Sequence, residues 1–200
     1  MTRATRFLFI VALASILAAC NGARTITATE LARIMPSAAD APMGTGLRAA
    51  QVGPKTLDQF VDDAAVRAKL LSLGFDIAYT ASFATPSFPP DASTAPPGSA
   101  LYATFGVLLK DAKTGARGFA YYAARSRARA RHLTVVLAQN LGDDSFAFHF
   151  SSLDNSPLPG AAYLWRVGNA LFSVVGIGNP SPDPAAVRSL VHVIDARAER

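Results

Sequence analysis

The first twenty residues constrain this chain more than any other stretch, because they indicate where it folds and how much of it folds. Two arginines, Arg3 and Arg6, precede an apolar run from Phe7 to Ala19. A basic start followed by a short apolar stretch and small residues is typical of a secretory signal peptide. The apolar run has about 13 residues, too few for a helix that must cross roughly 30 Å of hydrocarbon. We therefore expect an export signal and not a membrane-spanning helix.

The end of this segment, Leu17-Ala18-Ala19-Cys20, resembles the lipobox of bacterial lipoproteins. In that family the thiol of the cysteine is lipidated, the preceding peptide is removed, and the new N-terminus is usually acylated. The resemblance implies cleavage between Ala19 and Cys20. It also implies anchoring to the extracytoplasmic face of the cell membrane through acyl chains such as palmitate on Cys20. The alternatives are an uncleaved anchor, or a simple signal peptide with a chance cysteine.

Cys20 is the only cysteine, so no disulfide can form within the chain. Half of the residues are hydrophobic and 16% are charged, which is typical of a globular protein. About 181 residues follow the signal, enough for one domain with a core of its own. We expect a lipidated cysteine and polar tether over 20–27 and a single, monomeric domain over 28–200 that is stabilised by burial.

The basic residues gather in one part of the sequence. The formal net charge is +5, and seven lysines and arginines lie between 110 and 131. Within a helix, Arg125 and Arg129, and also Arg127 and Arg131, are like-charge pairs at i,i+4 that cost a few tenths of a kcal/mol each. These four arginines are therefore candidates for contact with anionic lipid or a cell-wall polymer, and the alternative is a solvated outer face. An exported protein rarely meets nucleic acid, so we expect no nucleic-acid partner.

Hydrophobic spacing and capping residues predict four helices and about five strands. The helices begin after Thr27, Thr56, Asp111 and Asp183, and the strands lie at 76–84, 101–109, 145–153, 163–167 and 170–174. Residues 135–137 form a further short strand or continue the third helix. Residues 36–54, which are rich in glycine and proline, are expected to be irregular.

The strongest local signal is the pair Gly168-Asn169, which separates two alternating apolar runs. A two-residue link of this kind predicts a β-hairpin. It would make Trp165 and Phe172 cross-strand neighbours on a buried face. Because regular alternation of strands and helices is missing, the pattern favours an α+β fold, an antiparallel sheet with helices packed mainly on one face.

A loop with five prolines is predicted at 85–98. It is either a stiff, solvated connection inside one domain, or a presented loop or linker with a functional role.

Enzyme signatures are missing from the sequence. There is no Gly-x-Ser-x-Gly elbow, His-Glu-x-x-His helix or Gly-Lys-Ser phosphate loop. The three histidines, His132, His149 and His192, are far apart and have no metal-ligand spacing. Asp143 and Asp144 follow a glycine, so they are expected to bond the nearby backbone of a turn. We expect no catalytic residue, no metal and no cofactor.

Three short segments resemble small actinobacterial lipoproteins and sensor-type extracytoplasmic domains. They are 35–44 (MPSAADAPMG), the turn Leu141-Gly142-Asp143, and the hairpin that runs from Arg166 to Asn169. The resemblance implies a sheet with packed helices and a binding role. Kinase-linked members of the group carry disulfides, which this chain lacks, and the group offers no catalytic residue to carry over.

These observations favour a lipid-anchored, non-catalytic domain at the cell envelope that binds a ligand in the manner of a sensor. The alternatives are a structural or assembly partner of another envelope protein, and a hydrolase with an unrecognised site. A large exposed apolar patch would favour assembly, and a concave pocket would favour ligand binding. A cluster of His149 with Asp143 or Asp144 would favour a hydrolase.

Overall fold

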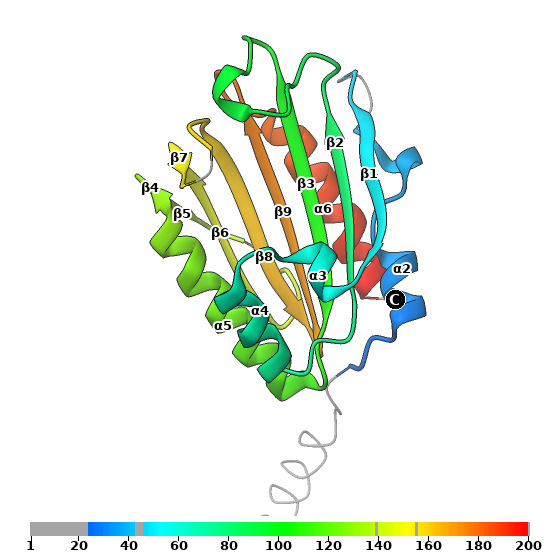
Figure 1. Ribbon diagram of the computed structural model, residues 1–200. Coiled ribbons are helices and arrows are strands. Elements are labelled where there is room, and N and C mark those ends of the chain that lie inside the picture. The colour runs from blue at the N-terminus through cyan, green and yellow to red at the C-terminus, as the bar shows by residue number, and fades with distance from the viewer. Residues whose placement is uncertain (1–23, 43–45, 139, 155, 200) are drawn as a thin grey trace, which may run out of the picture.

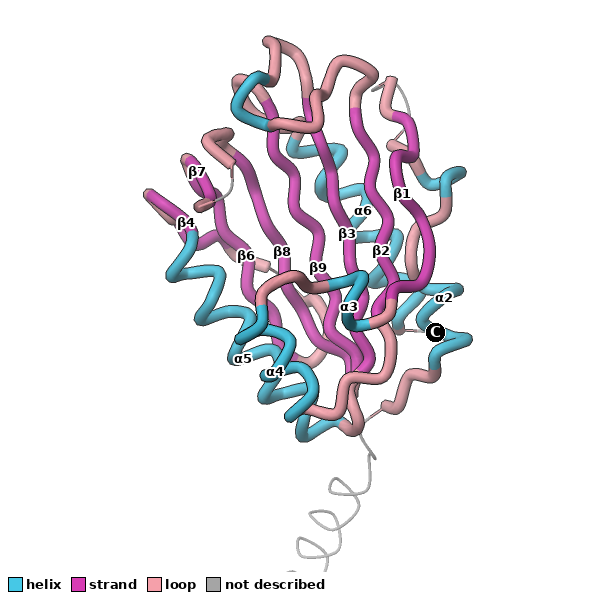
Figure 2. Tube along the Cα trace, in the orientation of Figure 1, coloured by secondary structure: helices cyan, strands magenta, loops and turns pink. Residues whose placement is uncertain are grey.

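The computed structural model describes residues 24–42, 46–138, 140–154 and 156–199, and seven antiparallel strands in these ranges form one sheet (Figures 1 and 2). Their order across the sheet is β1-β2-β3-β9-β8-β6-β5. The strands are β1 (Arg48–Lys55), β2 (Ala78–Ala84), β3 (Ala100–Leu108), β5 (Thr134–Val136), β6 (Asp144–Phe150), β8 (Gly160–Val167) and β9 (Ala170–Gly178). The short strands β4 (Ala130–Arg131) and β7 (Ser152–Leu153) pair separately. The α+β class is confirmed, and the sheet is larger than the predicted five strands.

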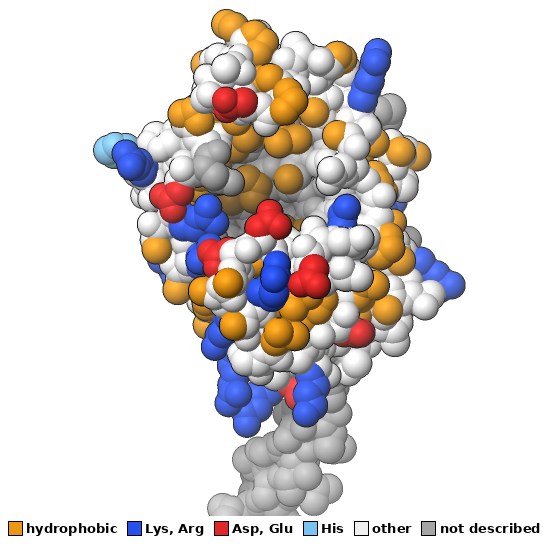
Figure 3. Space-filling model, viewed as in Figure 1, with side chains coloured by type: hydrophobic (Ala, Val, Ile, Leu, Met, Phe, Trp, Pro, Cys, Tyr) orange, Lys and Arg blue, Asp and Glu red, His pale blue; other side chains and the backbone are white. Residues whose placement is uncertain are grey.

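Helices cover both faces of this sheet, whereas the sequence predicts helices mainly on one face. They are α2 (Ala28–Ile34), α3 (Leu57–Phe60), α4 (Ala64–Ser72), α5 (Ala112–Arg129) and α6 (Pro184–Ala198). In β9, Phe172 and Val174 pack with α2 and α6, while Leu171 and Val175 point to the face covered by α3, α4 and α5. Every position of this central strand is apolar or small because both of its faces are buried. The α5 face is covered incompletely, and Figure 3 shows a hollow in it.

The predicted caps form as expected. Thr27 accepts a hydrogen bond from the amide of Glu30, whose carboxylate accepts one from Thr27 in return, and this capping box begins α2. Asp111 caps α5 in the same way, and Asp183 caps α6 ahead of Pro184. Gly74, with φ at +68°, ends α4 as predicted.

Two local predictions differ from the structure. Residues 36–54 were expected to be irregular, but 48–54 belong to the edge strand β1, which pairs with β2. Its side chains are largely exposed, so it carries no apolar alternation, and an edge strand tolerates Pro54. The single helix expected after Thr56 is broken into α3 and α4, because Val61 is extended and Asp63 caps a new helix through the amides of Ala65 and Val66.

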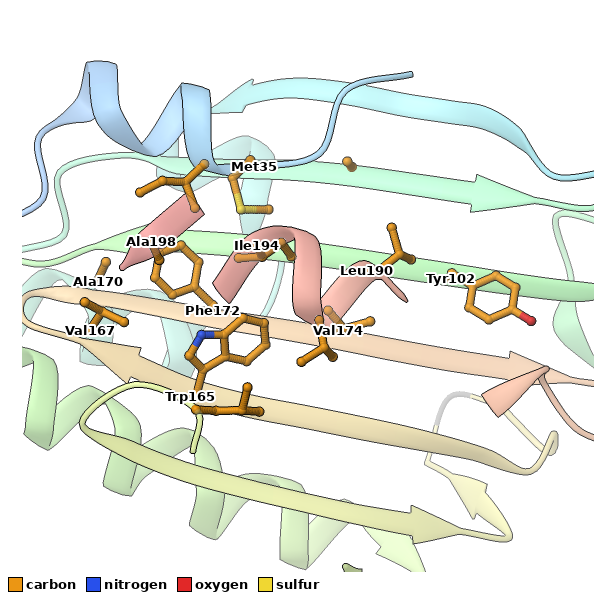
Figure 4. Packing of buried hydrophobic residues seen from close by; sticks show 14 of the residues in the cluster. Met35, Tyr102, Trp165, Val167, Ala170, Phe172, Val174, Leu190, Ile194 and Ala198 are labelled. Carbon is orange, nitrogen blue, oxygen red and sulfur yellow. The ribbon is translucent and has the colours of Figure 1, made fainter. Parts of the chain in front are cut away.

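The Gly168-Asn169 hairpin is confirmed, and it also holds the start of the described chain. Trp165 and Phe172 are cross-strand partners with ring centroids 5.6 Å apart, and both are fully buried among α2, α6 and the sheet (Figure 4). The side chain of Asn169 accepts a hydrogen bond from the Ile26 amide and donates to the carbonyls of Ile26 and Leu109. Ile26, in the segment expected to be tether, is 1% exposed and belongs to the core.

All of these contacts lie within residues 24–199. The sheet, both helical layers and the three apolar clusters described above are formed by residues of this range. A chain that lacks residues 1–20 therefore keeps every contact described here, and it is a suitable form for experiments in solution.

Candidate ligand-binding cleft

An open cleft of about 480 Å³ lies between the second half of α5 and the sheet face that α5 covers. In Figure 3 it is the hollow with apolar side chains at its base. Small-molecule sites typically measure roughly 300–1,000 Å³. The cleft is therefore large enough for a ligand, and it is the concave feature that the sequence could not locate.

Two glycines explain why α5 leaves a gap over only part of the sheet. A Cβ atom at Gly115 would lie 2.5 Å from the carbonyl oxygen of Gly168, and one at Gly118 would lie 2.6 Å from a methyl group of Leu109. The first half of the helix therefore lies directly against the hairpin. The second half carries larger side chains, and the α5 residues that line the cleft all come from it. The first half of α5 is therefore in close contact with the hairpin, and the cleft separates the second half from the sheet.

The floor of the cleft is mostly apolar and includes three small residues. They are Ala103 of β3, Ala162 of β8 and Ser173 of β9, which lie on three adjacent strands. Larger apolar side chains lie among them, namely Leu101, Phe105, Leu164, Val175 and Ile177. Because the buried floor offers few polar atoms, it favours a hydrocarbon portion of a ligand.

The proline-rich loop 85–98 forms one wall of the cleft. Phe88, Pro90 and Ala92 line it. The loop is attached to the end of β9, because the Asn179 side chain donates to the carbonyl of Ala95, and the amide of Gly98 donates to the carbonyl of Asn179, each at 2.8 Å. The loop is thus a fixed part of the domain, and its prolines hold apolar side chains beside the sheet.

The α5 wall is the polar side of the cleft. Tyr122, Arg125, Ser126 and Arg129 line it at spacings of three and four residues, which place them on one helix face. Arg125 pairs with Asp63 at 2.6 Å, and Arg129 pairs with Asp154 at 3.3 Å. The backbone amide of Val66 and the guanidinium of Arg125 hold the pKa of Asp63 below its usual value.

Tyr122 has the most unusual environment of this wall. Its hydroxyl is buried and has no hydrogen-bond partner among the described residues. Burial raises the pKa of this phenol well above its ordinary value, and the neighbouring Tyr121 adds to the effect, so the hydroxyl stays protonated. A buried donor without a partner is uncommon in native proteins and indicates a place where a ligand or water can accept a hydrogen bond.

The four arginines predicted to contact an anionic surface do not share one face. Arg125 and Arg129 border the cleft, whereas Arg127 is exposed and stacks over the ring of Phe146 at 4.1 Å. Arg131 follows the helix in β4 and is exposed. The helix periodicity separates them, and contact of all four with an anionic surface stays a prediction.

The turn and hairpin motifs that the sequence singled out meet in space. Arg166 lies 2.9 Å from the carboxylate of Asp143 and 2.7 Å from that of Asp144. Asp143 also accepts the amide of Gly168, and Gly142 adopts φ +49° where a side chain would meet the Arg166 carbonyl. The two motifs are joined by these ion pairs and this hydrogen bond. The prediction that both aspartates bond the nearby backbone of their own turn is wrong, because their carboxylates contact Arg166 and the Gly168 amide of the hairpin.

Neither a metal-holding group nor the cluster of His149 with Asp143 or Asp144 is present in the described part of the chain. No three histidine, cysteine or acidic side chains approach one another there closely enough to hold a metal ion. His132, His149 and His192 are all exposed, and His149 lies near the opposite end of β6 from Asp144. The specific cluster that would favour a hydrolase is not assembled.

Ala19 and Cys20, the predicted cleavage and lipidation site, lie outside the described residues. Within the ranges that the structure covers, no helix combines the length and the apolar character needed to span a membrane.

The fold is similar to that of a known extracellular domain. No family model and no curated protein matches the sequence. The solved extracellular domain of PknH from Mycobacterium tuberculosis superposes with a TM-score of 0.60 at 8% identity. The match covers 90% of this chain and 100% of that domain. At this identity the likeness concerns the fold alone, and it agrees with the α+β architecture expected of a sensor-type domain.

Sequence reasoning did not find the cleft. Its floor residues come from three strands that are neighbours only in the folded sheet, so no linear motif marks them. One signal was present, since Tyr122, Arg125 and Arg129 recur at helical spacing within the basic segment. That spacing distinguishes Arg125 and Arg129, which border the cleft, from Arg127 and Arg131, which do not.

Proposed function

We propose that this protein is a lipid-anchored, extracytoplasmic and non-catalytic domain that binds a small apolar or amphipathic molecule in the cleft beneath α5. The observation that carries the proposal is the cleft itself, an open space of about 480 Å³ over an apolar floor. The resemblance of its fold to the extracellular domain of PknH supports an extracytoplasmic, sensor-like role.

The chemistry of the lining supports binding over catalysis. The charged side chains that line the cleft are those of Arg125 and Arg129. The other polar side chains that line it carry hydroxyl groups. Guanidinium groups stay protonated at physiological pH, so they hold anions and do not exchange protons. Large exposed apolar side chains are the feature that would favour assembly with another protein. In the described chain they are Val52 in β1, Leu71 in α4, and Val135 and Leu137 in and after β5, so only the last two are close in the chain.

A lipid on Cys20 would place the cleft away from the membrane surface. The described chain begins at Arg24, beside the Gly168 turn, and the proline-rich wall lies at the other end of the sheet (Figure 1).

Replacing Cys20 by alanine should abolish lipid labelling and release the protein from membranes. Unchanged labelling and retention of the Cys20→Ala protein would contradict the anchor.

A cleft-filling variant tests ligand binding. Ala103→Phe places a ring on the floor, and the chain without residues 1–20 should then lose most of its binding of the neutral, polarity-sensitive dye Nile red. Ala124→Phe is the matched control, because Ala124 is exposed on the outer side of α5. Both variants are checked for folding by circular dichroism. Equal dye binding by a folded Ala103→Phe protein and the wild type would refute the cleft as the binding site.

A further inference from the structure

The two walls of the cleft differ in chemistry, and this difference indicates what kind of molecule fits. The sheet wall is mostly apolar, while the α5 wall carries Arg125, Arg129 and Tyr122, whose buried hydroxyl has no hydrogen-bond partner in the described chain. No acidic side chain is among the described residues that line it. A molecule that satisfies both walls needs a hydrocarbon part and an anionic head.

The ion pairs position the two arginines and leave them able to bind. Arg125 uses one terminal nitrogen for Asp63, and Arg129 uses its Nε for Asp154. A guanidinium has five N–H donors, so donors remain for a further anion. The aspartate side chains are 45% and 56% exposed, against 28% and 36% for their arginine partners. Solvent therefore screens the negative charges more than the positive ones that face the cleft.

Asp63 positions the side chain of Arg125 and is not itself among the residues that line the cleft. Its Oδ1 accepts the amides of Ala65 and Val66 at the start of α4, and its Oδ2 holds Arg125. The N-cap of α4 is therefore attached to the arginine at the cleft. This arrangement fixes the guanidinium above the opening, where a loose arginine would lose conformational entropy on binding.

The Tyr122 hydroxyl supplies an independent indication of a ligand atom. The Tyr122 side chain lines the cleft, and its hydroxyl is buried, interacts electrostatically with Arg125 and donates to no acceptor in the described chain. An oxygen placed between Tyr122 and Arg125 would satisfy this donor, and a carboxylate or phosphate offers such an oxygen with a charge that suits the arginine.

We propose that the ligand is a single-chain anionic amphiphile, with its hydrocarbon tail on the floor formed by β3, β8 and β9 and its acidic head held by Tyr122, Arg125 and Arg129. This inference rests on the proposed function. It adds the chemical class of the ligand and the residues that select it.

Three probes with the same hydrocarbon length test the head group: dodecanoate, dodecanol and dodecyltrimethylammonium. Each is titrated against Nile red bound to the chain without residues 1–20. The two charged probes are kept below their micelle concentrations, and dodecanol is kept below its solubility limit. Dodecanoate should displace the dye with a Kd about tenfold or more below that of dodecanol, as expected for one charge-assisted hydrogen bond. The cationic probe should bind more weakly than the alcohol.

Variants of α5 identify the residues responsible. Arg125→Gln combined with Arg129→Gln should remove the preference for dodecanoate and leave dodecanol binding unchanged. Arg127→Gln, on the same helix but away from the cleft, is the matched control and should keep the preference. Tyr122→Phe should weaken dodecanoate more than dodecanol. If the double variant unfolds, the wild-type preference is measured in rising salt, where it should shrink.

The outcomes separate the two proposals. Equal affinity for dodecanoate and dodecanol, both lost in Ala103→Phe, would overturn the anionic head while leaving the cleft as a binding site. A preference that survives in the folded double variant or in high salt, or tighter binding of the cationic probe, would overturn it as well. If no probe displaces the dye and Ala103→Phe binds Nile red normally, the proposed function itself fails.

Discussion

Asn169 offers a quantitative test of how the start of the domain is held. Its side chain forms three buried hydrogen bonds: it accepts from the Ile26 amide at 2.7 Å, and it donates to the carbonyls of Ile26 and Leu109 at 3.1 Å each. Alanine at this position would leave all three backbone groups without their partner. Ile26 is 1% exposed and Leu109 is 2% exposed, so water does not reach them in the intact fold.

The expected loss of stability depends on whether each unpaired backbone group can reach water in the Asn169→Ala variant. The Leu109 carbonyl stays buried between strands, and an unsatisfied buried group costs roughly 1–3 kcal/mol. Ile26 is near the beginning of the described chain and can move into water, which forfeits roughly 1.5–3 kcal/mol of side-chain burial. We expect Asn169→Ala to lower the free energy of unfolding by about 3–6 kcal/mol.

Urea unfolding measures this change, with the fluorescence of the only tryptophan, Trp165, as the signal. At an m value of about 2 kcal/mol/M, the midpoint should fall by roughly 1.5–3 M. Limited proteolysis near Ile26 should also accelerate. Gln51→Ala on the exposed edge strand is the control and should change stability by less than about 0.5 kcal/mol. A loss below about 1 kcal/mol with Asn169→Ala would show that Asn169 does not anchor this segment.

Two further predictions concern the core and its charges. Trp165→Ala should lower stability by about 3–5 kcal/mol in urea unfolding followed by circular dichroism, whereas Leu137→Ala, 85% exposed, should have little effect. Asp195 is buried, and its burial, together with the charge of Glu199, raises its pKa. The folded state therefore binds the proton of the Asp195 carboxyl more tightly than the unfolded state does. The ionised carboxylate destabilises the fold at pH values above the ordinary aspartate pKa, and this effect disappears at pH values below it. Asp195→Asn should raise stability at pH 7 and have no such effect near pH 3; equal effects at both values would contradict this reasoning.

Local signals in the sequence predicted local structure correctly. Thr27, Asp111 and Asp183 begin helices because their side chains satisfy free amides within three residues. Gly168-Asn169 forms the predicted hairpin and brings Trp165 against Phe172, because a two-residue turn determines the register of both strands. Each of these features depends on interactions between residues that are close in the chain.

Features that depend on distant partners were predicted less well. β1 was missed because an edge strand is stabilised by backbone pairing with β2, which leaves no apolar alternation in its own side chains. The helices were expected mainly on one face, although the continuous apolar character of β9 is typical of a strand with both faces buried. Which helix covers which face is decided by chain connections that the sequence pattern does not show.

The sequence by itself determined the α+β class, most of the helix ends, the hairpin, and the prediction of an export signal that ends at Ala19, just before Cys20. Only the tertiary structure decided the site. The cleft exists because Gly115 and Gly118 bring one half of α5 against the hairpin, while small residues on three strands leave space under the other half. A cavity depends on the distances between surfaces that pack together, and these distances are set only when the sheet and helix meet in the folded protein.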